Sequence, residues 1–86
     1  MTLVSLKNIG REMQKKLESV GVCQPQDLRQ LGSKAVFLHL KRRYPKVCLV
    51  HLYTLQAAID GIELSQLPET IKKDLKQFSD SLKPAD

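Results

Sequence analysis

Three cations recur every four residues near the start of the chain, in the stretch LKNIGREMQKKLESVG. They are Lys7, Arg11 and Lys15, and on an α-helix this spacing places them along one face. The turn at residues 8–10 would present backbone N–H groups at the positive end of the helix, where an anion is favoured. Gly10 has no Cβ, so a phosphate could approach its backbone closely. The stretch predicts either a turn that holds phosphate without reading bases, or a capped helix whose outer face is simply solvated.

A second basic cluster lies at the predicted end of another helix. Its members are Lys41, Arg42, Arg43 and Lys46. Cations at a helix C-terminus interact favourably with the helix dipole, which is a sufficient structural reason for the cluster. It would also extend a phosphate-contacting surface if the fold placed it beside the first turn.

The remaining polar residues give little support for catalysis or metal binding. His39 and His51 stand in no local motif such as H-E-x-x-H, and pairing either with a cysteine would require tertiary proximity. Cys23 and Cys48 form no C-x-x-C pair and lie among apolar residues, so we expect reduced, buried thiols. A disulfide between them is allowed by their number alone. We expect a non-enzymatic protein with no metal site and no cofactor.

Composition indicates one small globular domain. The chain has 86 residues and a net charge of +5, with 42% hydrophobic and 27% charged residues. The basic excess favours an acidic partner such as nucleic acid, although inert domains also carry such a charge. The N-terminus does not resemble a signal peptide, and the longest charge-free run, 47–59, is too short to span a bilayer. We therefore expect a cytoplasmic protein that does not associate with membranes.

Apolar residues at spacings of three and four, interrupted by glycine and proline, predict an all-α fold. The pattern indicates helices at about 10–20, 25–31, 34–44 and 47–60, and a fifth within 62–82 that starts near Pro68. We expect residues 1–86 to form one compact five-helix domain, with a core at about 3–82 and a frayed tail.

Several residues have the chemistry of helix caps. Asn8 and Ser33 are predicted N-caps of the first and third helices, and Gly21 a left-handed C-cap. The fourth helix is apolar nearly all round, so we expect it at the centre of the fold. The apolar stripe of the fifth helix is expected to face the core, or to pair with another chain if it is wider than the core needs.

Four segments in this order resemble the C-terminal domain of the TfoX/Sxy competence-regulator family. They are LKNIGREMQKKLESVGV, DLRQLG, YPKVCLVHLYTLQAAIDG and LPETIKKDL, and the resemblance covers about residues 3–78. The family's regulators carry a further N-terminal domain. Because Met1 lies only a few residues before the first segment, we expect that domain to be absent and the chain to be a stand-alone member or an excised domain.

The first half also resembles the helix-hairpin-helix-like unit in the C-terminal domain of the RNA polymerase alpha subunit. That unit contacts DNA mainly through backbone and phosphate, and the resemblance points to Asn8, Gly10 and Arg11 as contact residues. We therefore expect a transcription-regulatory module whose partner is double-stranded DNA or a transcription-complex protein. The expected contacts are Lys7, Asn8, Gly10, Arg11 and Lys15, with the cluster at 41–46 as a second surface. The alternative is a protein–protein interaction module without direct DNA binding, and the sequence leaves the oligomeric state open.

Overall fold

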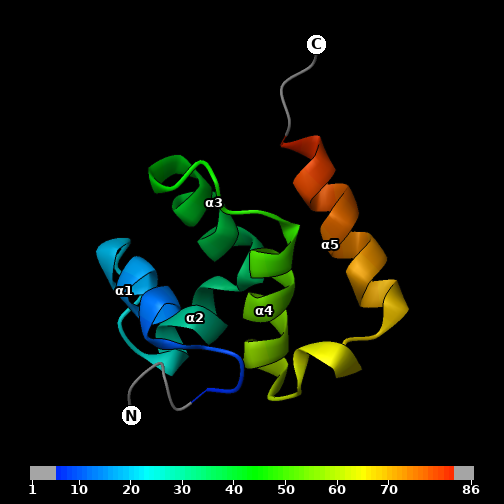
Figure 1. Ribbon diagram of the computed structural model, residues 1–86, viewed down its shortest axis with the longest axis horizontal. Coiled ribbons are helices and arrows are strands. Elements are labelled where there is room, and N and C mark those ends of the chain that lie inside the picture. Colours follow the sequence, from blue (N-terminus) through cyan, green and yellow to red (C-terminus); the bar gives the residue numbers. More distant parts are fainter. Residues whose placement is uncertain (1–5, 83–86) are drawn as a thin grey trace.

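The computed structural model describes residues 6–82, and this part of the chain folds into five α-helices without a strand (Figure 1). The elements are α1 (Arg11–Ser19), α2 (Pro25–Leu31), α3 (Ser33–Arg43), α4 (Leu49–Asp60), the short 3-10 helix η2 (Leu64–Gln66) and α5 (Glu69–Ser81). The predicted all-α, five-helix fold is confirmed. The predicted tail at 83–86 and the predicted start of the core at 3–5 lie outside the described residues.

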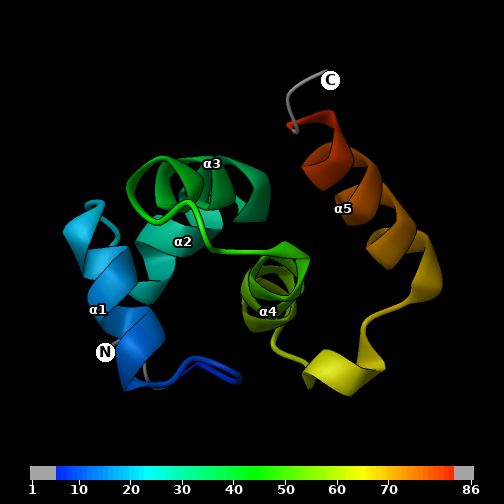
Figure 2. The same cartoon turned by 45° about the horizontal axis from the view of Figure 1, so that its top comes forward.

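Helix α4 lies at the centre of the fold, as its nearly continuous apolar sequence predicts. It contacts α2, α3, α5 and η2. Figures 1 and 2 show α1, α2 and α3 on one side of it and α5 on the other. Its side chains Leu52, Leu55, Ala57 and Ala58 are all fully buried. Burying one leucine contributes roughly 1.5–3 kcal/mol, so α4 is the scaffold on which the surface helices are placed.

Glycine and proline end the helices close to where the sequence predicts. Pro25 is the first residue of α2, where its missing N–H leaves no bond unmade. Gly21, after α1, has a φ of +88°, and Gly61, after α4, adopts φ +70° and ψ +28°. Because side chains disfavour this left-handed region, the two glycines allow sharp exits from their helices.

Three helix starts differ from the prediction. Gly32 occupies the N-cap position of α3, and Ser33 is instead a buried helical residue whose Oγ donates a hydrogen bond to Gln56 Oε1 at 2.6 Å. Helix α4 begins at Leu49, two residues later than predicted, because Cys48 is extended and serves as the N-cap. Pro68 is likewise the extended N-cap of α5 and not its first residue.

The predicted capping role of Asn8 is wrong. The N-cap of α1 is Gly10, and Asn8 adopts a φ of +71°, which asparagine tolerates better than most residues. Its Nδ2 donates to the carbonyl of Ile62 at 2.9 Å, and its Oδ1 accepts from the N–H of Leu64 at 3.3 Å. Asn8 therefore fastens the turn before α1 to the segment that leaves α4.

Candidate nucleic-acid interface

The turn before α1 is open toward solvent. Gly10 has φ −94° and ψ −178°, an extended conformation available to any residue, and no side chain caps the first turn of the helix. A Cβ added at Gly10 would meet no atom within 4 Å. The fold itself thus does not require glycine here, and the N–H groups of the first turn have room for an anion beside them.

Arg11 and Lys15 lie exposed on α1, one helical turn apart as predicted. Leu17 is the fully buried residue of this helix. Most of the α1 surface therefore faces solvent, and its cations are accessible to a partner.

Lys7 and Asn8 have contacts of their own within the fold. Lys7 Nζ lies 3.7 Å from Glu63 Oε1, and both side chains are more than half exposed, at 54% and 58%. Such a surface pair contributes little free energy and can exchange for another anion. The amide of Asn8 is occupied by the bonds to Ile62 and Leu64. Contact of either residue with phosphate stays a prediction.

The second basic cluster divides into one structural cation and three exposed ones. Lys41 Nζ donates a hydrogen bond to the carbonyl of Val47 at 2.8 Å, so it holds the loop between α3 and α4. Arg42, Arg43 and Lys46 are exposed. The exposed three are available to a ligand.

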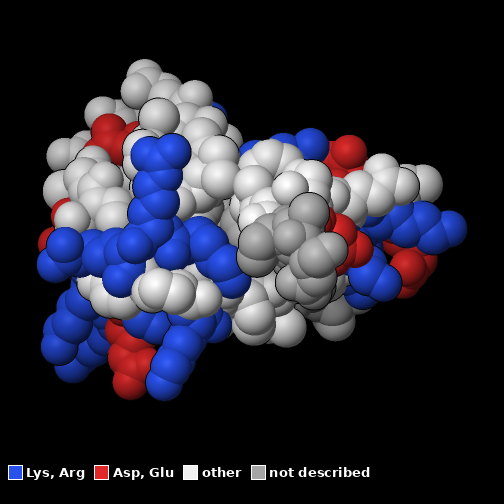
Figure 3. Space-filling view, turned by 90° about the horizontal axis from the view of Figure 1, so that it is seen from above, with Lys and Arg blue, Asp and Glu red and all other residues white. Residues whose placement is uncertain are grey.

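Tyr44 connects this cluster to α1. Lys16 Nζ of α1 lies 5.6 Å from the centroid of the Tyr44 ring, and Arg43 Cζ lies 5.8 Å from it. The Tyr44 hydroxyl shares a hydrogen bond of 2.9 Å with Ser19 Oγ, at the end of α1. The fold therefore brings the second cluster to the C-terminal end of α1, whereas Lys7, beside Glu63, lies toward the opposite end of α4. In Figure 3, Lys and Arg gather around α1 and the end of α3 with an acidic side chain among them, and around α5 basic and acidic side chains alternate.

A cavity of about 460 Å³ opens where these segments meet. Its lining residues come from α1, the end of α3, the α3–α4 loop and the first turn of α4: Lys16, Arg43, Tyr44, Pro45, Lys46, Val47 and His51. Positively charged and apolar side chains thus line the same cavity.

Lys16 is a contributor that sequence reasoning missed. It stands beside Lys15 but lies on a different face of α1, and only the fold places it against a tyrosine that follows a separate helix. The sequence does hold one sign of this site, since Arg43 and Tyr44 are neighbours. Surfaces that bind single-stranded nucleic acid combine cations with aromatic side chains in this way.

The cations at this end form no ion pair with a carboxylate of residues 6–82, although Glu12 and Glu18 stand on α1 among them. Within residues 6–82, the ion pairs join Lys7 to Glu63, Lys34 to Asp74 and Lys72 to Glu69. The field of the unpaired cations also affects Tyr44. The hydrogen bond with Ser19 lowers the pKa of the tyrosine hydroxyl below its ordinary value of 10.0, and Arg43 and Lys16 lower it further.

The prediction of buried cysteines is wrong, because Cys23 and Cys48 are both exposed free thiols. Cys48 Sγ lies 3.5 Å from His51 Nδ1, a proximity that a catalytic pair would need. However, the N–H of Cys48 donates to the same Nδ1 at 3.0 Å. Because a neutral imidazole nitrogen has one acceptor site, this bond competes with transfer of the thiol proton. The contact is thus explained as the N-terminal cap of α4.

Neither a metal cluster nor a membrane-spanning helix is found in the part of the chain that the structure describes. No group of three or more His, Cys, Asp or Glu residues is placed there to hold a metal ion. None of its helices is both long enough and apolar enough to cross a bilayer.

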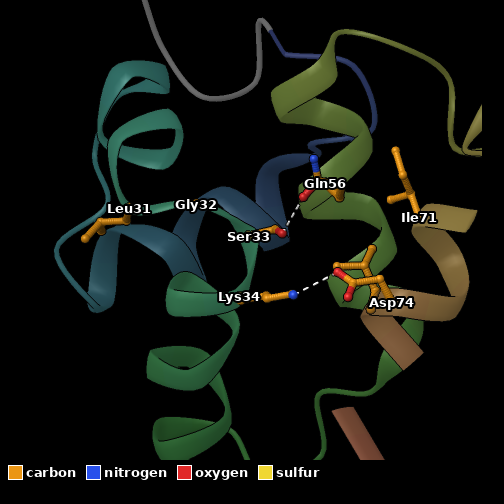
Figure 4. A pocket seen from close by; sticks show the side chains of 8 residues that line it. Leu31, Gly32, Ser33, Lys34, Gln56, Ile71 and Asp74 are labelled. Atoms are coloured by element: carbon orange, nitrogen blue, oxygen red, sulfur yellow. Dashed lines mark hydrogen bonds and ion pairs between the residues drawn. The ribbon is translucent and has the colours of Figure 1, made fainter. Parts of the chain in front are cut away.

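A second cavity, of about 450 Å³, lies between the start of α3, α4 and α5 (Figure 4). Its polar side chains contact one another across it. Ser33 bonds to Gln56, and Lys34 Nζ lies 2.8 Å from Asp74 Oδ2. Because these groups satisfy each other, the cavity presents no free charge to a ligand.

Comparisons with known proteins agree with the fold. Two crystal structures of Listeria monocytogenes proteins superimpose closely. The first, a triclinic form, gives a TM-score of 0.93 at 36% identity and covers 95% of this chain and 93% of that one. The second, a tetragonal form, gives a TM-score of 0.91 at 37% identity and covers 94% of this chain and 99% of that one.

Sequence comparison identifies the family. Protein Sxy of Escherichia coli (strain K12) is 33% identical over 82 residues, which make up 95% of this chain and 39% of Sxy. The chain thus spans about two fifths of the length of this relative. The family model of the TfoX C-terminal domain matches residues 1–79. The resemblance noted from the sequence is therefore confirmed, and the chain belongs to the TfoX C-terminal domain family.

Proposed function

We propose that this domain is a non-enzymatic regulatory module that associates with nucleic acid by contacting phosphates. The contact surface, called here the basic surface, consists of Arg11, Lys15, Lys16, Arg42, Arg43 and Lys46. The convergence of α1 and the end of α3 around Tyr44 carries the proposal, because it unites cations from separate segments, none of which forms an ion pair within residues 6–82. Membership of the TfoX family and similarity to Sxy support a regulatory role.

Two kinds of phosphate contact are available. The cations of the basic surface attract the backbone and release its counterions, which makes binding strongly dependent on salt. The open turn at Gly10 adds backbone N–H groups aimed at an anion. Neither kind of contact reads base edges, so we expect weak sequence preference.

The test is fluorescence anisotropy of a labelled random DNA duplex, titrated with the protein from low to physiological salt. If about six phosphates are contacted, affinity is expected to fall roughly 10³-fold between 50 and 200 mM salt. An Arg11→Glu/Lys15→Glu variant is expected to lose most of this binding. A Lys73→Glu/Lys76→Glu variant is the matched control, because it changes the charge by the same amount on exposed positions of α5.

Equal losses in both double variants would show that net charge alone drives binding, without a localised surface. No binding at low salt would contradict the proposal. The alternative, a protein–protein interaction module, has one specific observation in its favour: Leu31 and Val50 are large apolar side chains exposed at 47% and 56%. A protein partner held by such contacts should respond to Leu31→Ser and little to salt.

A further inference from the structure

The cavity beside Tyr44 combines two chemistries in one place. Tyr44, Pro45 and Val47 supply apolar surface, while Lys16 and Arg43 place positive charge over the ring, so a base that stacks on Tyr44 takes the place of one of these cations. Its volume of about 460 Å³ lies within the range of small-ligand pockets, roughly 300–1,000 Å³. A fitting ligand therefore carries a flat, largely apolar part and a negative charge close to it.

We infer that this cavity takes one unpaired nucleotide of a single-stranded nucleic acid, with the base against Tyr44 and the phosphate beside Lys16 and Arg43. The inference rests on the proposed function and adds to it the kind of nucleic acid that is preferred. A base within a duplex is stacked and paired, so it cannot enter a hollow of this kind without leaving the helix. A single strand offers its bases freely, and aromatic side chains next to cations are the usual means of binding it.

The surroundings favour a nucleotide over an acidic peptide. Further cations lie outside the cavity: Lys15 and Arg11 stand on a neighbouring face of α1, with Glu12 between them in the sequence. A nucleic-acid backbone carries a charge at every nucleotide, so a strand seated in the cavity could meet these cations in succession. An acidic peptide with a single apolar anchor would use the cavity and leave Lys15 and Arg11 without a partner.

Tyr44 is held in place for such a contact. Its hydroxyl is bonded to Ser19 of α1, while its backbone N–H donates to the carbonyl of Leu40 at 2.7 Å. The hydroxyl bond therefore attaches the ring to α1, and the backbone bond attaches the residue to α3, before any ligand arrives. Binding a base would require little ordering of the tyrosine, which preserves affinity.

The test compares three labelled ligands by fluorescence anisotropy: a mixed-sequence single strand, an abasic strand of equal length, and the duplex. The unchanged protein is expected to bind the base-bearing strand about 10- to 100-fold more tightly than the abasic strand, as expected for one stacked base. Tyr44→Ala should remove this difference, and it should weaken binding of the abasic strand and of the duplex by one common factor, because the bond to Ser19 that steadies α1 is lost with the ring. Tyr44→Phe keeps the ring and should retain the preference.

Each other outcome has a defined meaning. Equal affinity of the unchanged protein for base-bearing and abasic strands overturns the inference, and this comparison needs no variant to fold. Salt-dependent duplex binding would in that case leave the proposed function standing. If none of the three ligands binds at low salt, both proposals fail. Competition by poly-glutamate as strong as by the single strand would assign the cavity to acidic protein segments instead.

Discussion

A Gly10→Ala variant is expected to fold as well as the unchanged chain but to bind nucleic acid less tightly. Gly10 is extended, and a Cβ there meets no atom within 4 Å. Alanine is a poorer N-cap than glycine by roughly 0.5–1 kcal/mol, but it also lowers the entropy of the unfolded chain by a similar amount, about 0.4–1 kcal/mol. The two effects offset each other, so the free energy of unfolding should change by less than about 0.5 kcal/mol.

The effect on binding has a different origin. A methyl group at Gly10 would stand between a phosphate and the N–H groups of the first turn. Losing one hydrogen bond to a charged group weakens binding by about 1.5–3 kcal/mol, which corresponds to roughly 10- to 100-fold in Kd. Urea unfolding followed by circular dichroism measures the first quantity, and anisotropy with labelled DNA measures the second.

Gly61→Ala is the reciprocal control. Gly61 has φ +70°, where an alanine is strained by about 1–2 kcal/mol, so this variant should lose about 1 kcal/mol of stability. Gly61 contributes no atom to the basic surface, but Ile62 beside it holds Asn8, so any loss of DNA affinity should stay well below that of Gly10→Ala. If Gly10→Ala binds DNA as tightly as the unchanged protein, the backbone of this turn does not approach phosphate, and the side chains of the basic surface must account for binding alone.

Two further predictions concern Asn8 and Tyr44. Asn8→Gly allows the positive φ but removes the side-chain bonds to Ile62 and Leu64. The free energy of unfolding, measured by urea titration, should therefore fall by about 1–3 kcal/mol. An unchanged urea midpoint would show that these two bonds do not stabilise the fold. In a Tyr53→Phe background, absorbance at 295 nm should show Tyr44 ionising below pH 10, and polyphosphate bound at the neighbouring cations should raise that pKa. The folded protein favours the phenolate form of Tyr44 because its pKa is lower there than in the unfolded chain. The stability that this hydroxyl contributes therefore increases as the pH rises from the pKa in the folded protein toward 10, and it is lost as the pH falls below that pKa. A Tyr44 that titrates at 10 with or without polyphosphate would contradict the assigned electrostatics.

The sequence predicts the helices well because their ends are marked locally. Pro25 begins α2, and Gly61 closes α4 in the left-handed conformation that glycine tolerates best. The central position of α4 is equally local information, since its residues are apolar on nearly every face.

The mistakes have two causes: a contact with residues distant in the sequence, and a helix cap of unusual composition. Asn8 has the chemistry of an N-cap, yet its side chain bonds to a residue 54 positions away. Cys48 follows Val47 and precedes a run of apolar residues, which suggested burial. It is exposed because the N-cap position of a helix faces outward, and His51 completes that cap. The grouping of Lys16 with Arg43 depended on tertiary packing in the same way.

The contacts of α1 also explain how a short, mostly solvated helix can hold a binding surface steady. Leu17 alone anchors the helix fully in the core, and a nine-residue helix is marginal by itself. Asn8 ties the turn that leads into it to the end of α4, and Ser19 ties its last turn to Tyr44. Both ends are thus fixed by polar bonds, which leave the outer face free for cations. The basic surface is therefore organised before a partner binds, so its affinity is not reduced by the ordering of α1.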